Sequence, residues 1–415
     1  MAELAVDRER LRSDFESLAT FGRQPGGGVD RPSFSDADSK ARAWLTDACA
    51  AHGFTVREDP IGNLFIRLEA AEPSDATPVW TGSHIDSVPN GGRFDGAVGV
   101  LAAIEVIRRL REERVPLRRP VDAVVWTDEE GCFQGLLGST AATQGIRASD
   151  LGRIVSRDGV RLRQAMRDTG RDPDAIPLAK QQQGVPHAYL ELHIEQGSRL
   201  ELAGADIGVV TTVVGLGTGQ VTFHGRADHA GTTAMDRRRD ALQVAAAFVC
   251  DLARIPANVE RPEATATCGN LHVLPGADNI VPATATCRLD LRDPEPGGVS
   301  ALEDAVIALA HETAARYAVT VDYERDHLTH PVDLDPALQD LLAARASKLG
   351  YDHFRLPSGA GHDAQNVATI APAAMVFVPS KDGRSHCPEE YTSHEQLACG
   401  ADVLLNAVAE LGVSH

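Results

Sequence analysis

One stretch of the sequence decides how this chain is expected to fold: Thr81-Gly82-Ser83-His84-Ile85-Asp86-Ser87-Val88-Pro89-Asn90-Gly91-Gly92-Arg93-Phe94-Asp95-Gly96. An apolar run over 79–81 predicts a strand, and a glycine-rich loop then leads to Asp95 at the start of a predicted helix. His84 can bind a metal through one ring nitrogen, and Asp86 can orient that ring or restrain a neighbouring acid. Asp95 is placed to bridge two cations. The alternative is a polar turn with a helix-capping aspartate.

Three further segments place acids or histidines on or after predicted strands: Asp128-Glu129-Glu130 after 121–127, His193 within 189–194, and His386 after 373–378. Adjacent carboxylates can divide two tasks, metal binding and general-base catalysis. A solvated acidic loop is the alternative for the acids, and a hydrogen-bonded core position is the alternative for His193. A glycine-rich turn over 357–364 can present backbone N–H groups to an anion, or be a tight turn only.

Strands alternate with helices in the first half of the chain, which predicts an α/β domain with a largely parallel central sheet. Between 213 and 327 the order strand, helix, strand, strand, helix, strand has the ferredoxin-like pattern, with a long helix expected over 236–253. The α/β pattern resumes at about Pro336. We therefore expect a catalytic domain formed by 1–212 and 328–415, interrupted by an inserted α+β domain at 213–327.

Composition excludes several functional classes. The formal net charge of −19 disfavours binding to nucleic acid, whose phosphates require basic surfaces. No run of eighteen apolar residues predicts a membrane span, and the first residues lack the pattern of a signal peptide. Seven cysteines without any Cys-x-x-Cys pair argue against a disulfide framework or a thiolate zinc site. We expect a cytoplasmic protein with no nucleic-acid or membrane partner.

Taken together, three histidines and two carboxylates form a ligand set of nitrogen and oxygen atoms only: His84, Asp95, Glu130, His193 and His386. Such a set suits zinc, manganese, cobalt or nickel.

With these motifs in this order, the chain resembles the aminoacylase-type di-metal peptidase superfamily. Within it, the chain is similar to the branch of N-carbamoyl-L-amino-acid amidohydrolases (L-carbamoylases), allantoate amidohydrolases and β-ureidopropionase-like enzymes. The similarity extends from the loop Gly26-Gly27-Gly28-Val29 to the C-terminal helix. It implies a di-zinc-peptidase-like catalytic domain with a ferredoxin-like lid or dimerisation domain, and two divalent metal ions per subunit.

The resemblance also implies a role for each candidate ligand. His84 and His193 would hold separate metals, Asp95 would bridge them, Glu130 would complete one site and His386 the other. Glu129 would be the general base, supported by Asp86.

For the substrate, the resemblance points to five residues: Gln196, His229, Asn279, Arg292 and Gly361. Arg292 offers a planar fork for a carboxylate, and His229 can donate to the oxyanion of the tetrahedral intermediate. In the family, residues of the inserted domain complete the site of the partner subunit, which implies a homodimer. A surface arginine at a strand end is the alternative for Arg292. Ser198 departs from the proline expected after His-Ile-Glu-Gln-Gly and lies outside the ligand set.

The expected reaction is hydrolysis of the ureido C–N bond of an N-carbamoyl-L-amino acid, a small molecule with a free carboxylate. Allantoate, a β-ureido acid, or an acyl amide or peptide as in aminoacylases and dipeptidases is the alternative substrate. Two other classes stay open. One is a metal-bearing binding protein without catalysis, and the other is an amidohydrolase that uses Cys132 or Cys387.

Overall fold

The computed structural model describes residues 3–72, 74–147, 149–180 and 184–414, so the outermost residues of the predicted catalytic domain, 1–2 and 415, lie outside it. The chain divides into two compact units. Unit 1 comprises residues up to Thr211, Leu334–Leu356 and the chain from Ala360 onwards, and unit 2 comprises Thr212–Asp333 with Pro357–Gly359. The sequence placed the inserted domain at 213–327. Its role as a lid or dimerisation domain stays a prediction.

The larger sheet is mixed, and its strand order is β1 (Thr55–Glu58), β2 (Leu64–Leu68), β4 (Val121–Trp126), β3 (Val79–His84), β5 (Ala188–Ile194), β13 (Ala373–Val378), β6 (Ile207–Val213) and β11 (Val332–Asp333), with β12 (His353–Ser358) also pairing with β6. The central strands β4, β3, β5 and β13 run parallel. β1, β2, β6 and β11 pair antiparallel at the two sides. The expected parallel arrangement is therefore confirmed for the centre of the sheet. It is wrong for its margins, where the strands pair antiparallel although only β1 and β2 are joined by a short connection.

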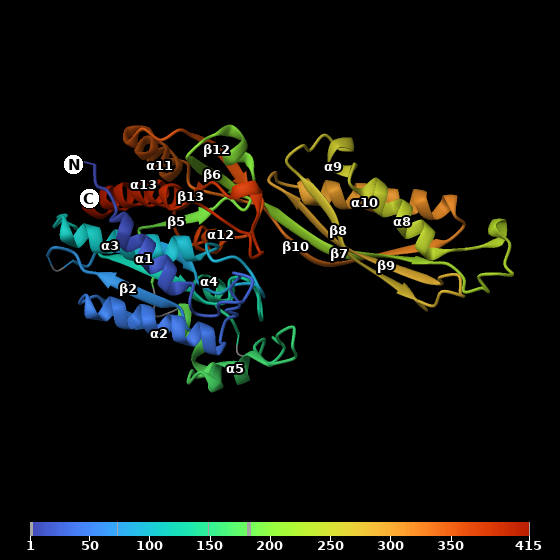
Figure 1. Cartoon of the computed structure of the whole chain (residues 1–415), viewed down its shortest axis with the longest axis horizontal. Coiled ribbons are helices and arrows are strands. Elements are labelled where there is room, and N and C mark those ends of the chain that lie inside the picture. Colours follow the sequence, from blue (N-terminus) through green and yellow to red (C-terminus); the bar gives the residue numbers. More distant parts are fainter. Residues whose placement is uncertain (1–2, 73, 148, 181–183, 415) are drawn as a thin grey trace. The chain divides into compact units, whose positions relative to one another are not determined.

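The helices of unit 1 are α1 (Arg8–Leu18), α2 (Asp36–Ala51), α3 (Ala97–Glu112), α4 (Leu137–Thr143), α5 (Leu162–Asp168), α7 (Arg199–Ala203), α11 (Pro336–Leu349), α12 (Asp363–Val367) and α13 (His394–Val413), with 3₁₀ turns at Pro173–Leu178 and Lys381–Gly383. Helix α3 packs on β3, β4 and β5, and α13 packs on β5 and β13 (Figure 1). The start of α2 is set by Ser35, whose side chain accepts the Asp38 backbone N–H. Such a cap satisfies one of the free donors at a helix N-terminus.

Helix α13 has the length and composition of a membrane span, the only such helix found in the described part of the chain. Within its most apolar window, 72% of the residues are buried inside the structure. It packs against α3, α11 and the central strands. Its apolar composition is therefore that of a core helix.

Strand β5 shows why the site lies on one face of this sheet. Its even-numbered members Leu190, Leu192 and Ile194 join the apolar core formed with α3 and α13. Since successive side chains alternate between faces, Glu191 and His193 point to the opposite face. The alternative considered for His193, a core position, is thus half right, because this histidine is buried but does not belong to the apolar cluster.

Unit 2 is built on a smaller antiparallel sheet with strand order β10 (Thr320–Thr329), β7 (Gly215–His224), β9 (Thr284–Asp293) and β8 (Thr265–Leu274). Helices α8 (Ala241–Leu252) and α10 (Gly298–Arg316) cover one face, and α9 (Ile255–Asn258) follows α8 (Figure 1). The element order β7, α8, β8, β9, α10, β10 matches the predicted pattern. Helix α8 begins later than the predicted 236, because Asp240 caps it by accepting the backbone N–H groups of Leu242 and Gln243. Residues Met235–Arg237 form a separate 3₁₀ turn.

Candidate metal centre

The predicted ligands converge because the parallel strands end at the same edge of the sheet. His84 is the last residue of β3, His193 lies one residue before the end of β5, and Glu130 follows β4. His386 comes from the loop after β13. Strands β3 and β5 are hydrogen-bonded neighbours, so the rings of His84 and His193 lie side by side with centroids 5.9 Å apart. Sites outside the carboxyl ends of parallel strands are typical of α/β folds.

The ligand atoms form two groups that share Asp95, and within each group they lie within 4.8 Å of one another. In the first, Asp95 Oδ1 lies 3.6 Å from His84 Nε2 and 3.2 Å from His193 Nε2. In the second, His386 Nε2 lies 3.3 Å from Asp95 Oδ2 and 3.4 Å from Glu130 Oε2. Asp95 thus presents one oxygen to each group.

The structure groups the predicted ligands differently from the division expected from the sequence. The sequence analysis expected His84 and His193 in separate sites and Glu130 apart from His386, whereas the structure groups His84 with His193 and Glu130 with His386. The cause is the strand order, since β3 and β5 are direct neighbours although more than a hundred residues separate their histidines in sequence.

These distances fit metal ions. Two ligand atoms bound tetrahedrally at about 2.1 Å from one ion are about 3.4 Å apart, and the four spacings above cluster around that value. The ligand atoms of a third group, Glu191, His193 and His362, also lie within 4.8 Å of one another. The carboxylate of Glu191 is already occupied by protein donors, however, because it accepts hydrogen bonds from Ser83 Oγ, Tyr189 OH and Ala364 N–H.

The backbone fixes which ring nitrogen of each buried histidine faces the centre. His84 Nδ1 lies 3.1 Å from the carbonyl oxygen of Asp86, and His193 Nδ1 lies 3.0 Å from that of Ile194. A ring that donates its Nδ1–H to a carbonyl keeps the lone pair on Nε2. The Gly96 N–H donates to His193 Nε2 at 3.2 Å, which agrees with this tautomer. Both imidazoles are therefore oriented as metal ligands.

The electrostatics of the centre also call for cations. Burial alone would raise the pKa of Asp95, but interactions with the three nearby histidines hold that pKa well below its ordinary value. Burial, together with the Asp95 carboxylate, raises the pKa of Glu130 to about 7. The hydrogen bond with Asp95 raises the pKa of His386 to about 9. Bound protons thus reduce the repulsion within this cluster of acids and imidazoles. Divalent ions can take the place of those protons, because metal binding to such ligand sets releases protons.

Glu129 lies beside this centre, with its Oε2 3.5 Å from His84 Nε2. Burial raises the pKa of Glu129 well above its ordinary value, against the attraction of His84. Asp86 accepts the backbone N–H groups of Glu129 at 3.4 Å and Glu130 at 3.1 Å, and its Oδ1 lies 3.6 Å from His84 Nδ1. Asp86 is therefore placed for both roles considered above. It lies next to the His84 ring, and it binds the backbone of the loop that carries Glu129 and Glu130.

The backbone around the centre is strained. Asp128, Gln196 and His386 have φ values of 57°, 59° and 56°, in the left-handed region that non-glycine residues rarely adopt. Each such residue costs about 1–3 kcal/mol, and such residues cluster at functional sites. Hydrogen bonds compensate part of this cost, since the N–H of Asp128 donates to Ser33 Oγ and that of Gln196 donates to Ser380 Oγ.

Among the expected substrate residues of unit 1, Gln196 lies at the centre. Its Nε2 donates to Asp95 Oδ2 at 2.8 Å, and its buried Oε1 has no hydrogen-bond partner among the described residues. A buried amide oxygen without a donor carries an energetic cost that a ligand N–H can remove. Gly361 is exposed and directly precedes His362, whose buried ring packs edge-on against His193 at 4.5 Å between centroids.

Sequence reasoning missed Glu390 and Ser385, which hold Asp95 in place. Glu390 Oε1 accepts the backbone N–H groups of Phe94 at 2.9 Å and Asp95 at 3.0 Å. Ser385 Oγ lies 2.8 Å from Glu390 Oε2 and 2.7 Å from Asp95 Oδ2. A Cβ at Gly92 would overlap the Glu390 carboxylate, which explains a glycine there. The short distance of Ser385 and Glu390 from His386 in sequence was the available signal.

The remaining expected substrate residues belong to unit 2. The exposed His229 accepts the backbone N–H groups of Gly231 and Thr232 at Nδ1, so the neutral ring carries its proton on Nε2. The carbonyl of the exposed Asn279 accepts the Ala230 N–H, which joins the two loops. Arg292 donates to both carboxylate oxygens of Asp290.

The sheet of unit 2 keeps these residues apart. The loops of His229 and Asn279 adjoin the first residues of β9, where the Val281 N–H donates to the Asp228 carbonyl and the Gly225 N–H to that of Ala283. Arg292 is one residue from the other end of β9. The nine residues from Thr284 to Arg292, eight steps of about 3.4 Å each, span about 27 Å of extended strand. One copy of unit 2 therefore holds its predicted substrate residues at opposite ends.

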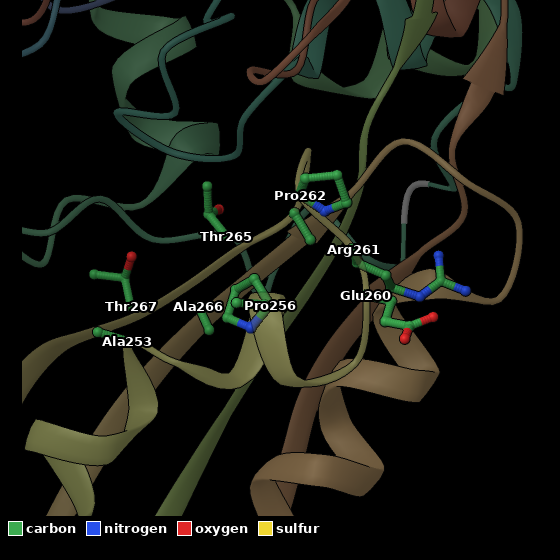
Figure 2. A pocket seen from close by; sticks show the side chains of 10 residues that line it. Ala253, Pro256, Glu260, Arg261, Pro262, Thr265, Ala266 and Thr267 are labelled. Atoms are coloured by element: carbon green, nitrogen blue, oxygen red, sulfur yellow. The ribbon is translucent and has the colours of Figure 1, made fainter.

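A cavity of unit 2 is lined by none of these residues. Figure 2 shows this cavity of about 570 Å³ between α9 and the edge strand β8. Its charged lining residues are Glu260 and Arg261, and Arg261 pairs with Asp293 and Glu295 at 3.2 Å. None of the residues found to line it is a predicted site residue, so it is not a candidate active site.

The sequence matches the model of Peptidase family M20/M25/M40 over residues 80–410. The chain belongs to this family. Its members are metal-dependent, in agreement with the ligand groups at the strand ends.

Full-length similarity supports the assignment to the M20/M25/M40 family. The chain is 39% identical to an N-carbamoyl-L-amino acid amidohydrolase of Geobacillus stearothermophilus, covering 98% of this chain and 99% of that protein. It is 33% identical to an allantoate amidohydrolase of Bacillus subtilis, covering 95% and 96%. Among solved structures, an amidase of the hydantoinase/carbamoylase family from Burkholderia multivorans superposes with a TM-score of 0.90 at 35% identity, covering 99% of both chains.

The contacts of Glu390 predict that it maintains metal affinity. Glu390→Ala removes the acceptor that fixes the backbone of Asp95, so metal affinity should fall roughly 10–100-fold, as for other residues that orient metal ligands. Competition against a chromophoric chelator measures this affinity. Glu389→Ala is the matched control, because this neighbouring carboxylate is exposed and contacts only Arg384 among the ion pairs described. Equal affinities of the two variants would refute the role of Glu390.

Proposed function

We propose that this protein hydrolyses the ureido C–N bond of N-carbamoyl-L-amino acids, giving the L-amino acid, carbon dioxide and ammonia. One observation carries the proposal: two metal-ligand groups share the Asp95 carboxylate, and Glu129 lies beside them at 3.5 Å from His84 Nε2. The 39% identity to an N-carbamoyl-L-amino acid amidohydrolase over nearly the whole chain supports this substrate class.

In this proposal each ligand group holds one divalent ion, either zinc or one of manganese, cobalt and nickel. His84, His193 and Asp95 would hold the first ion, and Asp95, Glu130 and His386 the second. Bound there, the two ions supply Lewis acidity toward the ureido carbonyl and lower the pKa of the attacking water.

The side chains around the centre move the protons. Glu129 takes a proton from the attacking water and returns it to the leaving nitrogen, a task suited to its place beside the two ligand groups. His229 Nε2–H donates to the oxyanion of the tetrahedral intermediate. The unpartnered oxygen of Gln196 is an acceptor for a ureido N–H. Asp86 keeps the Glu129 backbone in place.

Arg292 and Asn279 bind the rest of the substrate, and Arg292 takes the free carboxylate. An N-carbamoyl amino acid is far shorter than the span of about 27 Å along β9 between the His229 end and Arg292. Both ends of one unit 2 therefore cannot reach the same small molecule. We infer a homodimer in which each substrate meets Arg292 of one chain and His229 and Asn279 of the other.

Allantoate is the second candidate substrate, since a relative with this activity matches the chain at 33% identity. A cysteine-dependent mechanism is disfavoured. Burial, together with Asp128, raises the pKa of Cys132 to about 11, which leaves little thiolate. Cys387 belongs to neither ligand group. All seven cysteines are free, which fits a reducing compartment, and we therefore place the protein in the cytoplasm.

A substrate panel tests the proposed function. Protein stripped of metal by a chelator should be inactive, and zinc, manganese, cobalt or nickel should restore hydrolysis. Release of ammonia should be fastest with N-carbamoyl-L-amino acids, compared with allantoate, β-ureidopropionate and N-acyl amino acids. Prior alkylation of thiols should leave the rate unchanged. Turnover by protein shown to be metal-free by elemental analysis, or hydrolysis of acyl amides alone, would contradict the proposal.

Substitution of Glu129 should lower the catalytic rate, whereas substitution of Glu130 should lower metal binding. Glu129→Gln should retain metal but lower kcat roughly 10²–10⁴-fold, the range for loss of a general base. Glu130→Gln should instead lower metal occupancy, because it removes a carboxylate ligand whose Oε2 lies 3.4 Å from His386 Nε2 in the second group. Elemental analysis beside steady-state kinetics separates the two effects. The same loss of metal in both variants would mean that these roles are misassigned.

The shared site predicts complementation between two inactive variants. In a heterodimer of Arg292→Ala and His229→Ala chains, one site lacks both residues and the other has both. Because random exchange makes half of the dimers mixed, specific activity should recover to about a quarter of the wild-type value. Native mass spectrometry confirms the mixed dimer. A mixed dimer without activity would show that Arg292 and His229 serve a site from the same chain.

A further inference from the structure

The guanidinium of Arg292 is held by two partners within unit 2. Its Nε–H donates to Asp290 Oδ1 at 2.8 Å, and Nη2 donates to Asp290 Oδ2 at 3.0 Å. Nη1 donates to the Gly359 carbonyl at 2.8 Å. Asp290 thus binds the side edge of the planar group through two parallel hydrogen bonds, the arrangement that fixes a guanidinium most firmly.

The strand itself sets up this pair. Asp290 and Arg292 are two residues apart on β9, so both side chains leave the same face of the sheet. Leu289 and Leu291 alternate with them and are buried in the core under α8 and α10, which fixes the strand backbone. Asp290 therefore stands on a rigid support beside a side chain with four rotatable torsions.

The hydrogen-bond count leaves room for a ligand. A guanidinium carries five N–H donors, and Asp290 and Gly359 use three of them. One N–H on Nη1 and one on Nη2 remain. The Arg292 side chain is 35% exposed, so an anion can reach it from solvent.

We propose that Asp290 is a positioning residue for substrate recognition: it locks the plane of Arg292 so that the remaining N–H groups meet the carboxylate of the substrate. The inference rests on the proposed function, in which Arg292 binds that carboxylate. Asp290 does not contact the substrate and acts through Arg292 alone. The opposite role is sequestration, in which Asp290 competes with the substrate for the guanidinium, and it predicts a change of KM in the other direction.

Kinetics of Asp290→Asn with an N-carbamoyl-L-amino acid test the inference. An asparagine retains one acceptor and loses the second, so KM should rise on the order of tenfold, as a charge-assisted pair weakens, while metal content stays unchanged. Asp326→Asn is the matched control. Asp326 pairs at 2.8 Å with Arg288, another arginine of β9, and its loss removes the same charge from the same unit. The control should keep the wild-type KM.

Three comparisons separate positioning from a general effect of charge or structure. Asp290→Glu keeps the charge but moves it by one methylene, and KM should still rise. In an Arg292→Ala background, Asp290→Asn should add nothing to KM. For the primary amide of the substrate, which lacks the carboxylate, wild type and Asp290→Asn should have equal kcat/KM. An unchanged or lowered KM in Asp290→Asn, or an additive effect in the Arg292→Ala background, overturns the inference.

Failure of the proposed function looks different. If the wild type hydrolyses neither N-carbamoyl amino acids nor allantoate, or if Arg292→Ala leaves KM unchanged, the substrate assignment is wrong. The position of the Arg292 guanidinium in crystal structures of the wild type and Asp290→Asn then tests the inference without any substrate. A guanidinium that stays in place without the Asp290 carboxylate overturns it.

Discussion

The burial of one ionised carboxylate governs the architecture of the centre. Asp95 is 8% exposed, yet its pKa is held well below the ordinary value, so it is charged where desolvation opposes charge. Three imidazoles surround its oxygens, and Glu390 fixes its backbone. Removing a carboxylate from water is repaid only by close opposite charge. The strand order brings these partners together at one edge of the sheet, and the neighbouring acids add negative charge that cations can balance.

Local backbone strain is the cost of bringing these groups to one point. His386 and Gln196, whose side chains both lie next to Asp95 Oδ2, adopt left-handed φ values, and Gly96 does so at the start of α3. At Gly96 a Cβ would lie 2.3 Å from His84 Nε2, so only glycine lets the ring approach that turn. The packed parallel strands determine these conformations, because they leave few positions from which a side chain can reach the centre.

The sequence was sufficient for much of this architecture. Ser35, the apolar strands and the Asp95 loop predicted their elements well, because capping and hydrophobic periodicity are local signals. The grouping of the ligands was not predictable in this way, since it depends on β3 lying between β4 and β5. Glu390 could not be distinguished from Glu389, because only the tertiary fold buries one and exposes the other. The start of α8 required knowing which of Asp236 and Asp240 accepts the backbone N–H groups.

The predicted site residues of unit 1 and unit 2 differ in kind, acceptors in the first and donors in the second, and this difference has an electrostatic reason. The centre in unit 1 gathers acceptors, and an arginine among Asp95, Glu129 and Glu130 would form ion pairs with them and occupy the place of a cation. The donors expected to bind the substrate lie instead in unit 2, each oriented by its own neighbours: His229 by two backbone N–H groups and Arg292 by Asp290. Donors fixed by partners within their own unit keep their geometry whatever the acidic centre holds. Under the proposed function, a substrate with a carboxylate and a ureido group carries one group suited to each set.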